Sequence, residues 1–112
     1  MSRTFELHLQ RRYFDLVAAG RKTTEVRVLY PRLADLSAGD RIRFRVEDTD
    51  QACEVLVNGV TAYSDFEALL AGEDLATIDP TATREQQLSA MRSFYPAPKE
   101  SLGALAIAIT LT

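Results

Sequence analysis

One short stretch of the chain, residues 20–27, gathers polar side chains and reads Gly-Arg-Lys-Thr-Thr-Glu-Val-Arg. Glu25 and Arg27 are two residues apart, so an extended strand would place them on one face, with Lys22 where that strand begins. A carboxylate between two cations stays ionised and holds its neighbours in place. The cluster therefore suits recognition of a nucleotide or another planar polar ligand, or general acid–base chemistry by Lys22 and Glu25. The competing interpretation is an exposed ion pair, worth about 0–1 kcal/mol.

A second set of cations, Arg41, Arg43 and Arg45, occupies alternate residues. On one face of a strand they could follow a phosphate backbone or protect an edge strand from pairing with another chain. Residues 1–45 carry ten basic and five acidic side chains, a net charge of +5, whereas residues 46–112 carry three and eleven, a net charge of −8. The basic half predicts a local anion site despite the formal net charge of −3, and the acidic half would repel a long duplex.

Metal and thiol chemistry are expected to be absent. One histidine and one cysteine do not supply the ligands of a standard zinc site, and the five glycines form no phosphate-binding loop. Cys53 lies in an apolar stretch and is interpreted as a core residue. His8 falls on the polar face of its predicted strand and is interpreted as a surface residue that hydrogen-bonds. We expect neither a metal nor a cofactor.

Length and composition predict one globular domain covering residues 1–112. A hydrophobic fraction of 46% and a charged fraction of 26% exclude a disordered or fibrous chain. No apolar run approaches the roughly 18–20 residues of a membrane helix. The single cysteine excludes an internal disulfide and fits a reducing compartment. We therefore expect a cytoplasmic protein without membrane contact, and the sequence leaves its oligomeric state open.

Five segments have the residue patterns of strands: the first three alternate along the chain, the fourth is a long strand, and the last alternates alanine with larger apolar residues. They are Arg3–Gln10, Thr23–Val28, Arg41–Val46, Cys53–Ala62 (with a bend at Gly59) and Ala104–Leu111. One helix is predicted over Arg12–Ala19 and ends at Gly20. Two more begin at capping boxes, Ser64–Glu67 and Thr83–Gln86. The prediction is an α+β fold, a small barrel of about five or six strands with about three helices packed at its ends.

Several blocks of the sequence occur in the order of a known family. They are Tyr13–Arg27, which contains Gly20, Lys22 and Glu25, then Gly39-Asp40, Tyr63–Leu70, Phe94-Tyr95-Pro96 and Glu100–Gly103. With these motifs the chain resembles the ASCH domain family, whose fold is a PUA-like barrel. The resemblance implies a cleft between barrel and helices that the Lys22, Glu25 and Arg27 positions line, and RNA or nucleotide binding. Some relatives are hydrolases of acetylated cytidine or of RNA. The amidohydrolase relatives use a lysine, matched by Lys22, a threonine where this chain has Glu25, and a downstream glutamate.

The function predicted from the sequence is binding of RNA, single-stranded nucleic acid or a nucleoside in a basic cleft. The residues expected to contact the ligand are Lys22, Arg27, Tyr30, Arg32, Arg41, Arg43, Tyr95 and Glu100. Tyr30 offers stacking and Arg32 a phosphate contact. The first alternative is a metal-independent ribonuclease or nucleoside amidohydrolase in which Lys22 and Glu25 are catalytic. The second is a protein-interaction module that uses the acidic C-terminal half.

Overall fold

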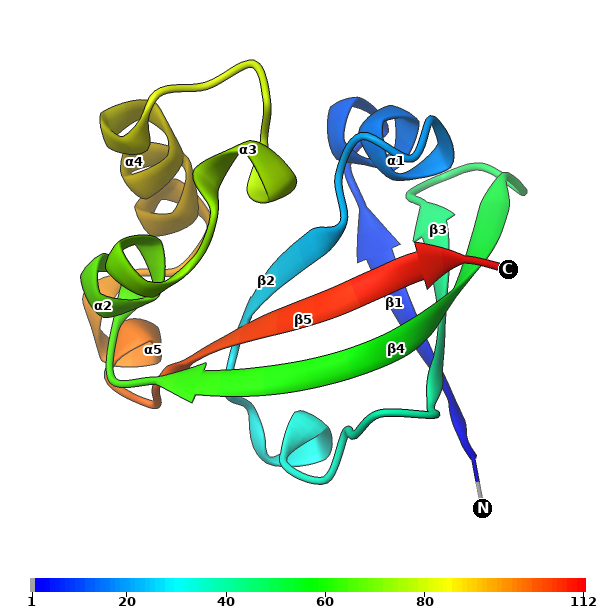
Figure 1. Ribbon diagram of the computed structural model, residues 1–112, viewed down its shortest axis with the longest axis horizontal. Coiled ribbons are helices and arrows are strands. Elements are labelled where there is room, and N and C mark those ends of the chain that lie inside the picture. The colour runs from blue at the N-terminus through cyan, green and yellow to red at the C-terminus, as the bar shows by residue number, and fades with distance from the viewer. Residues whose placement is uncertain (1) are drawn as a thin grey trace.

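Five strands form one sheet that curls into a half-barrel in the computed structural model, which describes residues 2–112 (Figure 1). The strands are β1 (Thr4–Leu9), β2 (Thr24–Val28), β3 (Arg41–Val46), β4 (Ala52–Tyr63) and β5 (Ala104–Leu111). Their order in the sheet is β1-β3-β4-β5-β2. β1 runs parallel to β3, and the other neighbouring pairs are antiparallel. The two edges of the sheet are therefore β1 and β2.

The inner face of the half-barrel is apolar, and the alternation along β3 shows how the sequence produces it. Ile42, Phe44 and Val46 of β3 are buried, and the side chains between them are arginines that point outward. The same core takes in residues from β1, β4 and β5: Leu7, Leu9, Val55, Val57, Leu105, Ile107 and Ile109. The alternation thus places the arginines of β3 on the outer surface of the sheet.

Strand β4 connects the two halves of the sheet. Its first residues pair with β3 and the remainder with β5, and the register shifts between Val57 and Gly59. A bulge of this kind bends a strand and increases its twist, which curls the sheet around its core. The bend predicted at Gly59 is confirmed.

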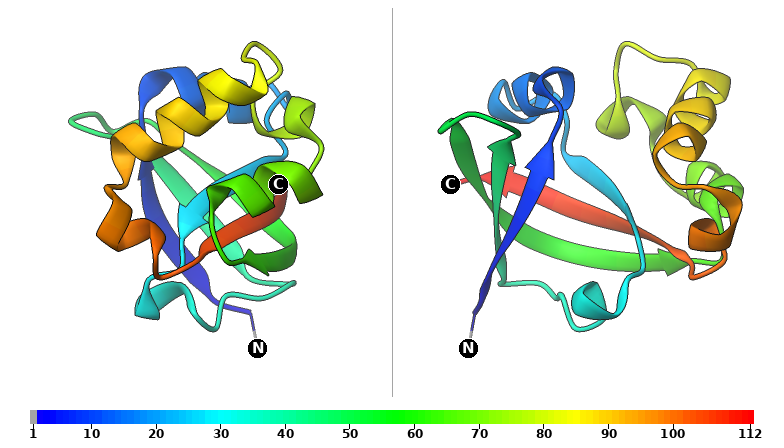
Figure 2. Two further views of the ribbon diagram at one scale, coloured as in Figure 1. Left: turned by 90° about the vertical axis from the view of Figure 1, so that its left-hand side faces the viewer. Right: turned by 180° about the vertical axis from the view of Figure 1, so that it is seen from behind.

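The helices gather at two places on the sheet (Figures 1 and 2). Helix α1 (Arg11–Ala18) packs against β3, and a 3₁₀ turn covers Pro31–Leu33. Helices α2 (Phe66–Gly72), α3 (Leu75–Ile78), α4 (Arg84–Phe94) and α5 (Ala97–Glu100) form a layer on the other side. A second core lies between this layer and the sheet and contains Val28, Phe66, Leu69, Leu70, Ile78, Met91, Ala104 and Ala106. The chain therefore has two hydrophobic cores, and the boundary between them lies between α1 and the helical layer.

The C-terminus of α1 sets the position of Lys22. Gly20 has a φ of 73°, a left-handed conformation that glycine adopts without strain. Its N–H donates to the Val17 carbonyl at 2.9 Å, and the Arg21 N–H donates to the Leu16 carbonyl at 2.9 Å, the two bonds of a Schellman motif. The Lys22 N–H also donates to the Leu16 carbonyl, at 3.1 Å. The chain thus reverses direction at once and places Lys22 directly before β2.

The predicted strands and α1 agree with the structure to within one residue at each end. Helices α3 and α5 are additional, because four residues are too few to show helical periodicity in a sequence. The capping box predicted at Ser64 is wrong: Asp65 is the N-cap of α2, and its carboxylate accepts from the Ala68 N–H at 2.8 Å. The box that begins at Thr83 is confirmed. No helix within residues 2–112 is long and apolar enough to cross a membrane.

Candidate functional site

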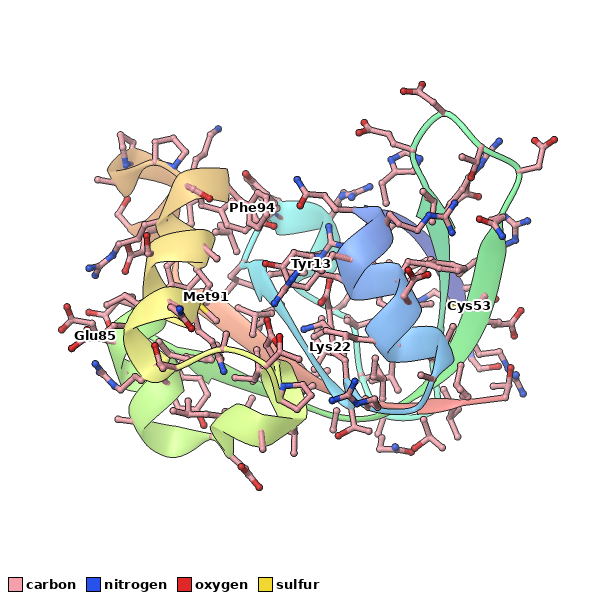
Figure 3. All side chains as sticks on the ribbon, turned by 90° about the horizontal axis from the view of Figure 1, so that it is seen from above. Tyr13, Lys22, Cys53, Glu85, Met91 and Phe94 are labelled. Carbon is pink, nitrogen blue, oxygen red and sulfur yellow. The ribbon has the colours of Figure 1, made fainter. Side chains whose placement is uncertain are left out.

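A cleft of about 650 Å³ lies at the boundary between α1, the adjoining end of the barrel and the layer formed by α3 and α4. Small-molecule sites typically have volumes of about 300–1,000 Å³. Figure 3 shows Tyr13 of α1 facing Phe94 and Met91 of α4, with Lys22 on the Tyr13 side. Glu85, also labelled there, points away on the far side of α4. The cleft is thus large enough for a nucleoside-sized ligand.

Three charged side chains predicted from the sequence come together in this cleft. Lys22 is 5% exposed and Glu25 is 3% exposed, although both line the cleft. The Lys22 ammonium lies 3.3 Å from Oε1 of Glu25, and Nε of Arg27 lies 2.7 Å from Oε2. The Glu25 carboxylate therefore uses one oxygen for each cation. The alternative of an exposed ion pair is excluded by this burial.

The Glu25 carboxyl is held in its charged form by these neighbours. Burial alone would raise the pKa of Glu25, but the charges of Arg27 and Lys22, and their hydrogen bonds, lower the pKa below its ordinary value. A charged carboxylate inside a protein needs such partners, because an unpaired buried charge is strongly unfavourable. The cluster, with one carboxylate and two cations, therefore carries a fixed net charge of +1 inside the cleft.

The ammonium of Lys22 is fully engaged by the protein. It donates to the Thr24 carbonyl at 2.9 Å and to the Ile78 carbonyl at 3.1 Å, and its third neighbour is Glu25. An ammonium has three hydrogens to donate, so these three acceptors satisfy it. The Ile78 carbonyl belongs to α3, which means that Lys22 joins the barrel to the helical layer across the cleft.

Arg27 joins the two edges of the sheet. Its Nη2 donates to the His8 carbonyl on β1 at 2.7 Å, while its Nε remains on Glu25. Strands β1 and β2 are the two ends of the strand order, so this side chain connects strands that share no ladder. Arg27 thus couples the charged cluster to the closure of the half-barrel.

A second charged group lies on the opposite wall. Asp79 is 4% exposed and pairs with Nη1 of Arg12 at 2.7 Å. It also accepts from the hydroxyl of Thr81 at 2.7 Å and from its N–H at 2.9 Å. Burial alone would raise the pKa of Asp79, but Thr81 and Arg12 lower it. The Arg12–Asp79 pair is thus a second bridge from α1 to the helical layer.

Three aromatic side chains line the cleft: Tyr13, Phe94 and Tyr95. Tyr13 and Phe94 meet edge to face with ring centroids 6.1 Å apart, and Phe94 is 45% exposed. The Lys22 ammonium lies 5.7 Å from the Tyr13 ring centroid, within reach of a cation–π interaction. Tyr95 lies beside Arg27 and packs on Phe66, and burial raises the pKa of its hydroxyl. Flat apolar faces therefore stand next to fixed charges.

The cleft is balanced in charge. Its basic side chains are Arg12, Lys22 and Arg27, and its acidic side chains are Glu25, Glu47 and Asp79. The sequence predicts a basic cleft, and the structure differs because Glu25 and Asp79 are folded into the walls beside their cations. Such a site favours a small polar ligand over a polyanion.

Residues 7–112 match the profile of the ASCH domain family. The chain belongs to the ASCH domain family. A search of curated proteins finds no significant match. The resemblance carried by the Tyr13–Arg27 block and the later motifs is thereby confirmed.

Several solved structures resemble this ASCH domain over its length. The hypothetical protein PH0355 is 30% identical, with a TM-score of 0.87, and the match covers 97% of this chain and 99% of that one. Protein PF0455 from Pyrococcus furiosus is 27% identical, with a TM-score of 0.75 and 96% of each chain covered. An ASCH protein from Zymomonas mobilis is 16% identical, with a TM-score of 0.69, covering 96% of this chain and 66% of that one. This last likeness shows the shared fold alone.

Other predicted contact residues of this ASCH domain lie outside the cleft. Arg41 pairs with Glu54 at 3.0 Å, and Arg43 lies 4.0 Å from Glu6, both on the outer face of the sheet. They alternate with core residues, so they cannot share the cleft with β2. Three further side chains lie elsewhere: Tyr30, Arg32 and Glu100.

Two of these have visible structural roles. Tyr30 packs against Tyr95 with ring centroids 6.2 Å apart, which supports the cleft from behind. Glu100 accepts from the Phe66 N–H at 3.1 Å and from Nε of Arg92 at 3.1 Å, so it fastens α2, α4 and α5 together. Of the eight predicted contact residues, Lys22, Arg27 and Tyr95 line the cleft.

The ASCH cleft also contains residues that sequence reasoning did not select. Tyr13 and Phe94 fit the helical spacing of core residues, and neither Asp79 nor Gln87 belongs to a motif. Their place follows from tertiary packing, which the sequence does not encode locally. Among the described residues no group of three or more His, Cys, Asp or Glu side chains could hold a metal ion. Cys53 packs against the barrel core, and burial raises the pKa of its thiol.

Proposed function

We propose that this ASCH domain binds a nucleoside, either free or as one unpaired nucleotide of an RNA strand, in the cleft between α1 and α4. The observation that carries the proposal is the buried Lys22–Glu25–Arg27 cluster at the wall of a cleft of about 650 Å³. Fixed charges with satisfied partners present oriented groups to a ligand without rearrangement. The aromatic rings at the opening supply faces on which a base can stack.

The balance of charge favours a nucleoside over a long phosphate backbone. A protein that follows a backbone neutralises several phosphates with unpaired cations. Within the cleft Lys22 and Arg27 share the Glu25 carboxylate, and Arg12 is paired with Asp79. Arg41 and Arg45 on the outer face also have acidic partners. A ligand with one or no phosphate matches this arrangement best.

A cleft-filling variant tests the proposal without removing a polar contact. Ala90 of α4 lines the cleft, and Ala90→Leu would occupy the ligand volume while preserving helix propensity. We expect calorimetric titration with nucleosides to show saturable binding that Ala90→Leu weakens at least tenfold. Ala71→Leu, on the exposed face of α2, is the matched control and should bind like the parent protein. Binding unaffected by Ala90→Leu would place the site elsewhere.

A second candidate function is hydrolysis of a modified nucleoside. It is favoured by the 3.3 Å separation of the Lys22 ammonium from the Glu25 carboxylate, a pair able to exchange a proton. For Lys22 to act as a base it must first lose a proton, and the neutral amine keeps two hydrogens for the carbonyls of Thr24 and Ile78 and gains a lone pair. Acylated nucleosides and short RNA incubated with the protein and EDTA test this candidate. Product formation that Lys22→Arg abolishes supports it, and turnover that persists removes Lys22 from the mechanism.

A further inference from the structure

The side-chain amide of Gln87 in α4 forms hydrogen bonds through its nitrogen but not through its oxygen. The side chain is 3% exposed, and its Nε2 lies within hydrogen-bond distance of three carbonyls, those of Leu75 at 3.0 Å, Asp79 at 3.1 Å and Ala82 at 3.3 Å. Carbonyls only accept, so the amide nitrogen must face them and the oxygen must face the other way. The orientation of this amide is therefore fixed by its surroundings.

The oxygen of that amide is a buried acceptor without a donor. Among the described residues, Oε1 of Gln87 is the one buried side-chain polar atom that has no hydrogen-bond partner. An unsatisfied buried polar group is destabilising, and such groups are rare in folded proteins. Gln87 lines the same cleft as Lys22 and Glu25. The unmet acceptor thus belongs to a residue of the cleft wall, and the oxygen itself is covered by its neighbours.

The surroundings of Gln87 define what kind of donor fits. Met91 lies one turn along the same helix face and also lines the cleft, and its unbranched side chain can move without backbone change. Phe94, on the next turn, contributes an exposed aromatic face opposite Tyr13. A ligand that stacks on this rim and reaches Gln87 must be flat and must carry an N–H at its edge.

We infer that Gln87 accepts a hydrogen bond from an N–H at the edge of a nucleobase, such as the amino group of adenine or cytosine, so that the cleft prefers bases that carry this donor to analogues that lack it. The inference rests on the proposed function, because it assigns part of the same cleft to the base. The amino group donates to Oε1 of Gln87 while the ring stacks on Phe94. The sugar or a single phosphate is left for Arg27, whose guanidinium keeps N–H groups beyond the two that bind Glu25 and the His8 carbonyl.

Deleting the donor from the ligand tests this inference, since deleting the amide from the protein would also break three internal hydrogen bonds. Adenosine is compared with purine riboside, and cytidine with pyrimidin-2-one riboside; each analogue lacks the amino group and adds no bulk. We expect the analogue to bind at least tenfold more weakly, because a site built around a hydrogen bond rejects a ligand that leaves it unmade. Equal affinities, within a factor of about two, would overturn the inference and leave the proposed function standing. Absence of binding by every nucleoside would overturn both.

A protein variant separates stacking from recognition of the amino group. Phe94→Ala should weaken all four ligands by a similar factor and leave the ratio between each nucleoside and its analogue unchanged. Leu111→Ala removes an apolar side chain of similar exposure at the end of β5 and should change nothing. A ratio that falls to one in Phe94→Ala would assign the discrimination to stacking and would count against Gln87.

Discussion

The charged cluster in the cleft consists of residues that depend on one another for their burial. Lys22 has three acceptors, Glu25 has two cations, and Arg27 divides its donors between Glu25 and the His8 carbonyl. Each member would be unfavourable alone inside the protein, and together they form a rigid polar surface. The same contacts that stabilise the fold therefore orient the groups offered to a ligand.

Removing one charge from this cluster should destabilise the protein strongly. In Lys22→Met the Glu25 carboxylate keeps one cation and loses the other, and two carbonyls lose their donor. Breaking a buried ion pair from one side typically costs about 3–5 kcal/mol, so we expect a loss near 3 kcal/mol in urea unfolding at neutral pH. Arg21→Met, at the exposed neighbouring residue, should change the free energy of unfolding by less than about 0.5 kcal/mol. Similar losses in the two variants would show that the cluster contributes no specific stability.

The ionisation of Glu25 should appear in the pH dependence of stability. Its pKa is lowered in the folded protein, so the stabilisation that it provides is complete above its unfolded pKa, near 4.5, and is lost as the pH falls through the lower folded pKa. The difference in unfolding free energy between the parent protein and Glu25→Gln should therefore be largest at neutral pH and shrink in acid. Urea titrations of both proteins between neutral pH and pH of about 3 measure this difference. A difference independent of pH would contradict a charged Glu25.

At the scale of elements, the sequence predicts the strands and turns that short stretches of residues determine by themselves. Five strands are recognisable because one face of each lies in a core, and Gly20 ends α1 because the Schellman motif needs a left-handed residue. Helix α3 is a single turn without periodicity. Its contact with Lys22 joins residues 56 positions apart in the chain, which no local pattern reports. The Lys22–Glu25–Arg27 segment was therefore predictable, whereas the opposite wall with Asp79 and Gln87 was not.

The turn at Gly20 should tolerate no side chain without a loss of stability. At its φ of 73° a Cβ would meet no neighbouring atom within 4 Å, so the loss in Gly20→Ala comes from backbone strain alone. We expect a decrease of about 1–2 kcal/mol in the free energy of unfolding. Gly59→Ala is the matched control, because its Cβ also has open space and its φ is not left-handed. Equal effects at the two glycines would argue against the role of the Gly20 turn.

At the scale of the whole molecule, the basic and acidic halves of the sequence do not form separate basic and acidic regions of the fold. Residues 1–45 carry a net charge of +5, yet their arginines pair with acidic residues from both halves: Arg12 with Asp79, Arg41 with Glu54, and Arg45 with Glu6 and Asp50. The sequence arithmetic correctly directs attention to the first half, where Lys22 and Arg27 lie. It overestimates the positive charge of the cleft, because which acids fold against which cations depends on tertiary structure.

Binding of single-stranded RNA should accordingly depend weakly on salt. A ligand held by its base and at most one phosphate should lose no more than about threefold in affinity between about 50 and 200 mM salt, whereas six to ten phosphate contacts on a single strand would give a loss of roughly three-hundredfold or more. Titration of a short single strand at the two salt concentrations measures this slope. A steep dependence on salt would contradict binding in the cleft and would indicate that the arginines of β3, on the outer face, contact the RNA.

Nuclear magnetic resonance titration of the uniformly ¹⁵N-labelled protein with adenosine and cytidine tests the central claim most directly. If a nucleoside occupies the cleft, the largest amide shift changes should come from residues on its two walls, such as Val26 of β2 and Ala90 of α4, and should saturate. Residues on the outer face of the sheet, such as Arg43, should remain unchanged. Shift changes centred on Arg43 and Arg45, or none at millimolar nucleoside, would contradict binding in the cleft.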